Sequence, residues 1–326
     1  MLEHSSFHSK DISSHSKDLS SFSDESEQGL RADSALISLF RLSTELEALA
    51  LKVNPWLRKQ SGDPEGREFK PDGSQVTACD REMERLFRAT CERVLKFPYV
   101  FLGEEAEEIA QTHEEKVASA KFVVVCDPID GTTNFIEGNG LYGCLLGIVE
   151  QKENARYSPV FGAVFLPEQE RLYITEGEDV IALNIATGER AKLLRHEATP
   201  TEKFKLSAYP PHKPFFVDGA FEGSQIERVT TNASIMDIER LIKGEIHASV
   251  ISGKWWDVAA LMAVTEKLGF EALSLRDGRS GYDMALDQFQ LKERERRWGM
   301  TEPFLIHDKK DQQKLLQLFH FKPVSL

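Results

Sequence analysis

Two acidic side chains follow a hydrophobic run at a spacing that suits a metal ion. Asp127 and Asp130 come directly after the run Val123-Val-Val-Cys. At the end of a strand, both carboxylates can point to one spot, with the carbonyl of Ile129 beside them. Hard oxygen ligands of this kind suit Mg²⁺. The plain alternative is a capped turn from a strand to a helix.

The residues that follow are suited to bind a phosphate. If Gly131, Thr132 and Thr133 open a helix or a turn, their backbone N–H groups face outward and can receive an anion. A metal ion and a phosphate would then lie side by side.

Two further acidic sites lie next to predicted elements. Glu104 and Glu105 follow an apolar run, so their carboxylates can reach the same end of the sheet, although residues 105–108 also fit a solvated charge run. Asp257 stands where a helix is predicted to begin, and its plain alternative is an N-cap. The combined acidic set supplies four negative charges, which match two divalent ions: Glu104, Asp127, Asp130 and Asp257.

Such a set fits the cleavage of a phosphate ester. Both the attacking and the leaving oxygen need charge stabilisation in that reaction, and two ions about 3.5–4 Å apart provide it. Bound cations also reverse the local charge, so an acidic protein can accept an anionic substrate.

Composition favours an ordinary globular protein. The chain has 326 residues, of which 41% are hydrophobic and 29% charged. Its 40 Lys and Arg against 53 Asp and Glu give a net charge of −13, so we expect no nucleic acid and no membrane partner. The four cysteines lack the spacing of a zinc site and indicate free thiols. With apolar runs far shorter than the ~18 residues of a spanning helix and no signal-peptide pattern, we expect a cytoplasmic protein.

The alternation of apolar and turn residues predicts a sheet with helices on one face, followed by a second half of α/β type. The first helix is expected to begin near Asp33 or Ser34 and to end at Pro55. The other predicted helices are 80–96, 232–243, 257–268 and 309–319. The predicted strands are 99–102, 122–126, 143–149, 160–165, 172–175, 246–251, 270–275 and 304–306.

The first thirty residues differ from the rest, since His8–Ser14 is repeated almost unchanged as His15–Ser21. We predict a flexible Ser/His-rich tail over residues 1–30 and a catalytic domain over residues 31–326, with subdomains of about 31–200 and 201–326.

Four segments carry a family resemblance: Lys70–Asp80, Gly103–Glu105, Asp127–Phe135 and Trp256–Ala260. In order and spacing they resemble the inositol monophosphatase family of Mg²⁺-dependent, lithium-sensitive phosphatases, over about residues 33–310. The resemblance implies a layered αβαβα sandwich, of the α+β or α/β class, that is usually a homodimer. It also implies Mg²⁺ as cofactor, with two or three ions per site, and a small phosphorylated substrate.

The resemblance assigns roles to single residues. Glu104, Asp127 and the Ile129 carbonyl are similar to ligands of a first metal ion, and Asp127, Asp130 and Asp257 to ligands of a second. Thr132, helped by Glu104, is similar to the residue that orients the attacking water, and Asp80 to the acid that bonds this threonine. The residues similar to those that contact substrate are Asp130, Gly131, Thr132, Thr133, Ala233 and Asp257.

Substrate choice rests on finer features. The Thr132-Thr133-Asn134 stretch resembles the inositol phosphatase branch more than the nucleotidase branch. However, Val250 stands where animal inositol phosphatases place a Glu that contacts inositol hydroxyls, and a valine accepts no hydrogen bond. We expect a phosphomonoesterase for a small phosphorylated polyol, with inositol monophosphate as the first choice. The alternatives are a 3′(2′),5′-bisphosphate nucleotidase, a histidinol phosphatase and a non-catalytic regulatory protein-binding role.

Overall fold

A computed structural model describes residues 18–70, 73–105, 112–153, 155–199, 201–209, 212, 215–222, 225–291 and 297–320. The side chains of α1 are described from Ser34 onward. Most of the predicted tail, and the first copy of its repeat, therefore lie outside the described residues.

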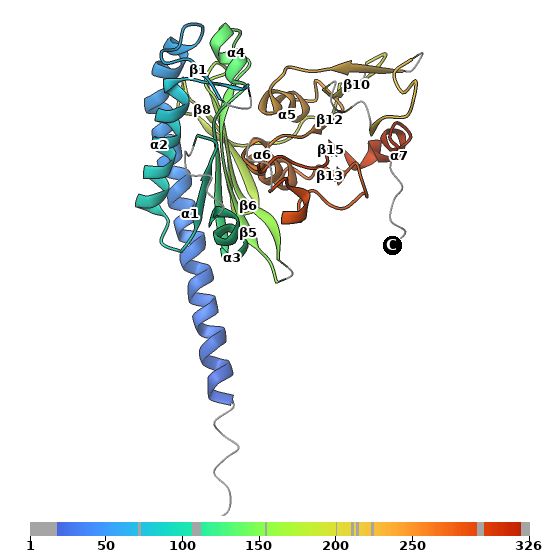
Figure 1. The fold of residues 1–326 in the computed structure, drawn as a ribbon. Helices are drawn as coiled ribbons and strands as arrows, with labels where there is room; N and C mark the ends of the chain where they lie inside the picture. The colour runs from blue at the N-terminus through green and yellow to red at the C-terminus, as the bar shows by residue number, and fades with distance from the viewer. Residues whose placement is uncertain are drawn as a thin grey trace, which may run out of the picture.

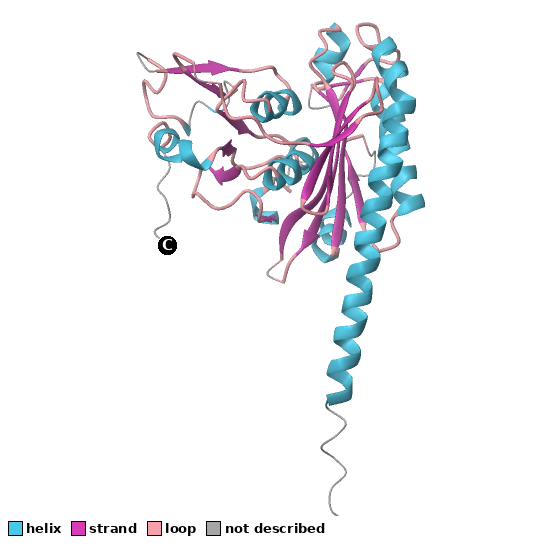
Figure 2. Ribbon diagram, turned by 180° about the vertical axis from the view of Figure 1, so that it is seen from behind, coloured by secondary structure: helices cyan, strands magenta, loops and turns pink. Residues whose placement is uncertain are grey.

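Two sheets and three helical layers build the molecule. The large sheet has the strand order β3-β4-β5-β6-β7-β8-β9, with β14 paired to β6, and the small sheet has the order β11-β10-β12-β15-β13. Helices α1 and α2 cover one face of the large sheet, α5 and α6 lie between the sheets, and α7 packs on the outer side of the small sheet (Figures 1 and 2). This αβαβα layering is the architecture that the sequence resemblance implied.

The helices are α1 Asp18–Gln60, α2 Ala78–Val94, α3 Thr112–Ser119, α4 Thr132–Glu137, α5 Ser234–Ile242, α6 Trp255–Lys267 and α7 Gln312–Leu316. The strands of the large sheet are β3 Val100–Gly103, β4 Phe122–Asp130, β5 Gly143–Gln151, β6 Arg156–Leu166, β7 Arg171–Glu176, β8 Asp179–Asn184, β9 Arg190–Lys192 and β14 Met284–Ala285. Those of the small sheet are β10 Phe204–Ser207, β11 Ile226–Val229, β12 Ala248–Ile251, β13 Glu271–Ser274 and β15 Phe304–His307. The hairpin β1 Glu68–Phe69 and β2 Gln75–Val76 stands apart from both sheets.

The first helix departs from its prediction at both ends. It begins at Asp18, well before Asp33, and it continues through Pro55 to Gln60. Val53 and Leu57 are both buried against the large sheet, so packing favours a helix that passes the exposed proline. The first turns of α1 extend beyond the body of the molecule (Figure 1).

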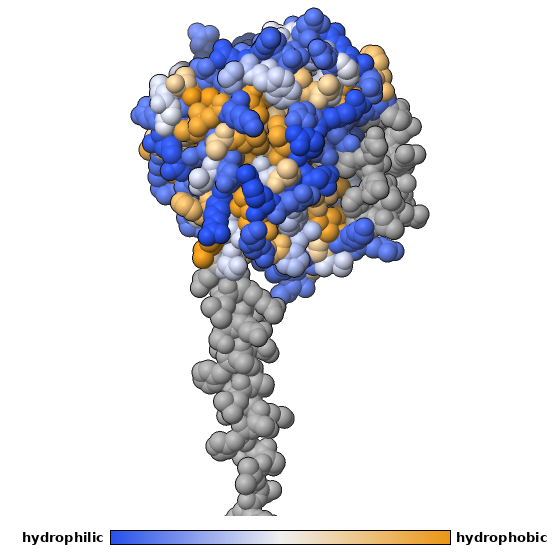
Figure 3. Space-filling model, turned by 90° about the vertical axis from the view of Figure 1, so that its left-hand side faces the viewer, coloured by the Kyte–Doolittle hydropathy of each residue, from blue (hydrophilic) through white to orange (hydrophobic). Residues whose placement is uncertain are grey.

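The solvent-facing side of α1 carries exposed apolar side chains. Leu36, Ile37, Phe40 and Leu51 each expose close to half of their surface or more. Their spacing places them on one stripe of the helix. Figure 3 views the molecule from the side that α1 and α2 cover and shows apolar patches among the polar surface. Among the described residues, no helix combines the length and apolarity needed to cross a bilayer.

Close packing of α6 on the large sheet depends on two glycines. A Cβ on Gly147 would lie 2.8 Å from the backbone N of Ala260, and one on Gly162 would lie 2.5 Å from its carbonyl oxygen. Since α6 carries Asp257, these glycines fix the distance between that carboxylate and the sheet.

We predict that Gly162→Ala lowers the free energy of unfolding by about 1–3 kcal/mol, because the added methyl group forces α6 away from β6. Chemical denaturation measures the effect. The control is Ala89→Ser, which also adds one heavy atom but at an exposed site on α2. A Gly162→Ala protein as stable as the wild type would contradict this account of the packing.

Candidate active site

Strands β3 and β4 direct acidic side chains to the α6 face of the large sheet. The two strands pair in parallel, and Leu102 lies opposite Val125. Both of these side chains belong to the core on the α6 side. Because side chains alternate along a strand, Glu104 and Asp127, two positions further on in each strand, point to the same face.

A bulge in β4 brings Asp130 to this face as well. Asp127 lies opposite Leu145 on β5 and Asp130 opposite Gly143, so three steps along β4 match two along β5. In a regular strand, residues three positions apart point to opposite faces, and one extra residue restores the same face. Ile129 accordingly packs in the core on the α2 side. The bulge explains how a D-P-x-D spacing places two carboxylates together.

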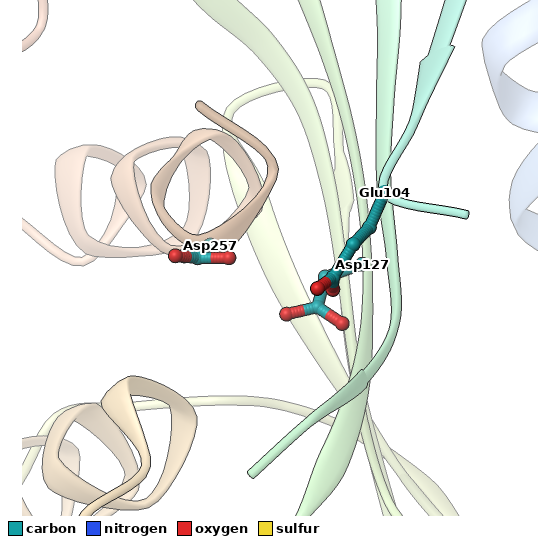
Figure 4. A group of neighbouring side chains, drawn as sticks. All are labelled: Glu104, Asp127 and Asp257. Carbon is teal, nitrogen blue, oxygen red and sulfur yellow. The ribbon is translucent and has the colours of Figure 1, made fainter. Parts of the chain in front are cut away.

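Helix α6 contributes the third member of a compact acidic group. Carboxylate oxygens of Glu104, Asp127 and Asp257 all lie within 4.8 Å of one another. Figure 4 shows Asp257 on α6 facing the two side chains of the large sheet. Asp257 also accepts the N–H of Lys254 at 2.7 Å, so it caps the helix from the third helical position. The capping and metal-ligand interpretations of Asp257 therefore coexist.

Asp130 and the Ile129 carbonyl lie beside this group with partners of their own. Asp130 Oδ2 accepts the N–H of Ile235, at the start of α5, at 2.6 Å. The Ile129 carbonyl lies 3.0 Å from the hydroxyl of Thr132. Of the predicted ligands, three carboxylates thus form the compact group, and these two oxygens lie next to it.

Burial and mutual repulsion disfavour ionisation of the acidic group. Burial raises the pKa of Asp127 well above its usual value, and the charges of Glu104 and Asp257 add to the shift. Burial, reinforced by Asp257, does the same to the pKa of Asp130. The pKa of Asp257 rises to about 7 through burial and the charge of Glu104. Buried, mutually repelling carboxylates are the donor set that a divalent cation neutralises, so these residues fit Mg²⁺.

Lys70 supplies a positive charge at the edge of the group. Its amino group lies 2.8 Å from Glu104 Oε1 and 2.6 Å from Glu105 Oε1. Burial acts to lower the pKa of Lys70, but the two carboxylates outweigh it and hold that pKa above its ordinary value. The sequence analysis quoted Lys70 only as part of a motif, and its contact with Glu104 was missed.

Helix α2 places Asp80 beside Thr132. Asp80 Oδ2 accepts the backbone N–H of Thr77 at 2.8 Å, and Asp80 Oδ1 lies 3.3 Å from the Thr132 hydroxyl. Burial raises the pKa of Asp80 to about 6, against the hydrogen bonds from Thr77. The hydroxyl of Thr132 has one proton, which it can give either to Asp80 or to the Ile129 carbonyl.

An open pocket of about 510 Å³ lies over these residues. Its lining consists of small or polar residues: Gly73, Ser74, Gln75, Glu104, Gly131, Thr132, Thr133 and Asn232. Gly131 adopts a φ of 84°, and a Cβ there would lie 3.1 Å from the Cβ of Ala233. Ala233 is therefore packed against the turn that carries the expected phosphate amides.

Two residues bear on substrate choice. Val250 is fully buried in the core of the small sheet, opposite Leu305, and does not line this pocket. Asn232, by contrast, lines the pocket with an unusual φ of 57°. Its only sequence signal was a departure from the Gly-Thr-Ala pattern.

Comparison with known proteins agrees with this geometry. The profile of the inositol monophosphatase family matches residues 41–317. Inositol monophosphatase 2 of Saccharomyces cerevisiae is 33% identical over 135 residues, which cover 40% of this chain and 42% of that protein. A histidinol-phosphatase of Streptomyces coelicolor is 35% identical over 100 residues, or 31% of this chain and 34% of that protein. These matches thus span less than half the length of these relatives.

Solved structures share the fold at low sequence identity. An IMPase/NADP phosphatase in complex with Mg²⁺ and phosphate superposes with a TM-score of 0.62 at 20% identity, covering 86% of this chain and 95% of that one. A staphylococcal inositol monophosphatase-1 in a LiCl-soaked inhibitory complex gives a TM-score of 0.60 at 20% identity, covering 86% and 94%.

The raised pKa values predict how pH acts on the metal-free protein. A carboxyl whose pKa is higher when folded holds its proton more tightly in the folded state, so its stabilising effect is full below about pH 4 and is lost towards pH 7, as for Asp257. In EDTA, Asp257→Asn should therefore melt progressively higher than the wild type between pH 5 and 8. Each kcal/mol of repulsion removed corresponds to about 2–4 °C.

Differential scanning calorimetry measures this difference, and the exposed Asp287→Asn serves as control. Mg²⁺ should raise the melting temperature of the wild type more than that of Asp257→Asn. If the two proteins melt with the same pH dependence in EDTA, the repulsion described above is absent.

Proposed function

The chain belongs to the inositol monophosphatase family, and on that premise we propose that it is a Mg²⁺-dependent phosphoric monoester hydrolase. The observation that carries the proposal is the compact group of Glu104, Asp127 and Asp257, which adjoins a polar pocket. We propose two or three ions per site, held by these three carboxylates with Asp130 and the Ile129 carbonyl. When bound, Mg²⁺ supplies Lewis-acid stabilisation of the charge on the reacting phosphate.

The residues around this site have separate proposed roles. The backbone N–H groups of Gly131 and Thr132 bind the phosphate, while Thr133 and Ala233 shape its surroundings. Thr132 donates its single hydroxyl proton to Asp80, which leaves the oxygen free to accept a hydrogen bond from the attacking water. Glu104 helps to hold that water in place.

The substrate is proposed to be a small phosphorylated polyol, most simply inositol monophosphate. The pocket residues can donate and accept hydrogen bonds to hydroxyls, and the described lining contains no aromatic side chain on which a nucleobase could stack. A histidinol phosphate remains the main alternative, because one relative is a histidinol-phosphatase. Bisphosphate nucleotides and a non-catalytic binding role are the other outcomes that the test separates.

We predict Mg²⁺-dependent phosphate release from inositol 1-phosphate that EDTA abolishes and Li⁺ inhibits. The panel also contains histidinol phosphate, fructose 1,6-bisphosphate and 3′-phosphoadenosine 5′-phosphate. Asp127→Asn should reduce turnover by more than the ~10–100-fold that loss of an outer-shell partner costs. Asp287→Asn is the control. A folded, Mg²⁺-binding protein that hydrolyses none of the four compounds would contradict the proposal.

Thr132 offers a separate test of the water-orienting role. Thr132→Ser keeps the hydroxyl and should retain most of the kcat, whereas Thr132→Val keeps the shape and should lower kcat by about 10²-fold, since the water loses its hydrogen-bond partner. KM should change little in both. Equal kcat values for the serine and valine variants would rule this role out.

A further inference from the structure

A buried carboxylate on α2 lies outside the proposed ligand set and yet touches the segment that carries a ligand. Glu84 is 6% exposed and follows Asp80 by four residues, so both acids lie on one face of α2. Its Oε2 accepts the backbone N–H of Glu105 at 2.7 Å. Glu105 directly follows Glu104, so this hydrogen bond anchors the chain where β3 ends.

The approach of Glu84 requires a glycine at the end of β3. A Cβ on Gly103 would lie 2.3 Å from both Cδ and Oε2 of Glu84, closer than any side chain can tolerate. Glycine at this position therefore leaves room for the carboxylate beneath the turn.

The opposite oxygen of Glu84 is held as well. Arg88 lies 3.1 Å from Glu84 Oε1, and its guanidinium stands 4.2 Å above the ring of Phe101 on β3. On the other side of the turn, Lys70 bonds the side chains of Glu104 and Glu105. The chain at Glu104 is thus fixed from α2 through its backbone and from the β1–β2 hairpin through its side chain.

We propose that Glu84 is a positioning residue, which fixes the Gly103–Glu105 segment and so sets where the Glu104 carboxylate lies for metal binding. This inference rests on the proposed function, since it takes Glu104 as a ligand. Lys70 must leave Glu104, or share it, when a cation binds. The backbone anchor from Glu84 is independent of that exchange and keeps Glu104 in place.

The experiment compares variants of the full chain by calorimetric titration with Mg²⁺ and by kinetics. Glu84→Met keeps the length of the side chain but cannot accept the N–H of Glu105, so it should weaken Mg²⁺ binding by about 10–100-fold. Glu84→Gln retains an acceptor oxygen and should bind close to the wild type. The control is Glu92→Met on the exposed end of α2. At saturating Mg²⁺, kcat should recover in Glu84→Met.

Gly103 gives a second route that does not remove Glu84. Gly103→Ala displaces the carboxylate and should weaken Mg²⁺ binding, whereas the same change in a Glu84→Ala background should add little. This non-additivity is the signature of two residues that act through one contact, and it keeps the proposal testable if Glu84→Met fails to fold.

The outcomes separate this proposal from the proposed function. If Glu84→Met lowers the melting temperature in EDTA but binds Mg²⁺ as the wild type does, Glu84 is structural only and the positioning role is wrong. Additive effects of Gly103→Ala and Glu84→Ala would also overturn it. Failure of the wild-type protein to bind Mg²⁺ would instead overturn the proposed function, and this inference with it.

Discussion

Electrostatic repulsion among buried carboxylates is the constraint on which the rest of the site depends. Glu104, Asp127 and Asp257 lie within 4.8 Å of one another, and Asp130 adds to the repulsion. Such a group opposes folding unless a proton, a lysine or a cation neutralises it. Protonation and the Lys70 contact serve in the metal-free protein, and the same features make the group a strong acceptor for a divalent ion. The binding of metal and the stability of the fold are therefore coupled.

The scaffold meets this constraint by confining flexibility elsewhere. The bulge in β4, the glycine-dependent packing of α6 and the anchoring of the β3 end each fix one carboxylate through backbone geometry. Two layers are involved, since α6 approaches the sheet from one face and α2 from the other. Several backbone constraints acting on one point are what hold charges together that would otherwise separate.

Sequence reasoning recovered the layers and the acidic group because both depend on local signals. The strand at β4 and the helix at α6 are apolar runs with clear limits, and the acidic motifs sit at their ends. The long α1 was misjudged because Pro55 normally ends a helix, while packing of Leu57 carried it further. The contacts of Glu84 and Lys70 join residues far apart in the chain, and no local pattern reports such a contact. Val250 was placed at the site by counting, but its side chain turns into the core.

The most direct test of the central claim is a crystal structure of the protein soaked with Mn²⁺ and phosphate, with the ions located by anomalous diffraction. We predict an ion bound by oxygens of Glu104, Asp127 and Asp257, at the octahedral distances of about 2.0–2.2 Å that such hard cations adopt. Phosphate should lie next to it, against Gly131 and Thr132. A protein that binds Mn²⁺ elsewhere, with none among these three carboxylates, would contradict the account.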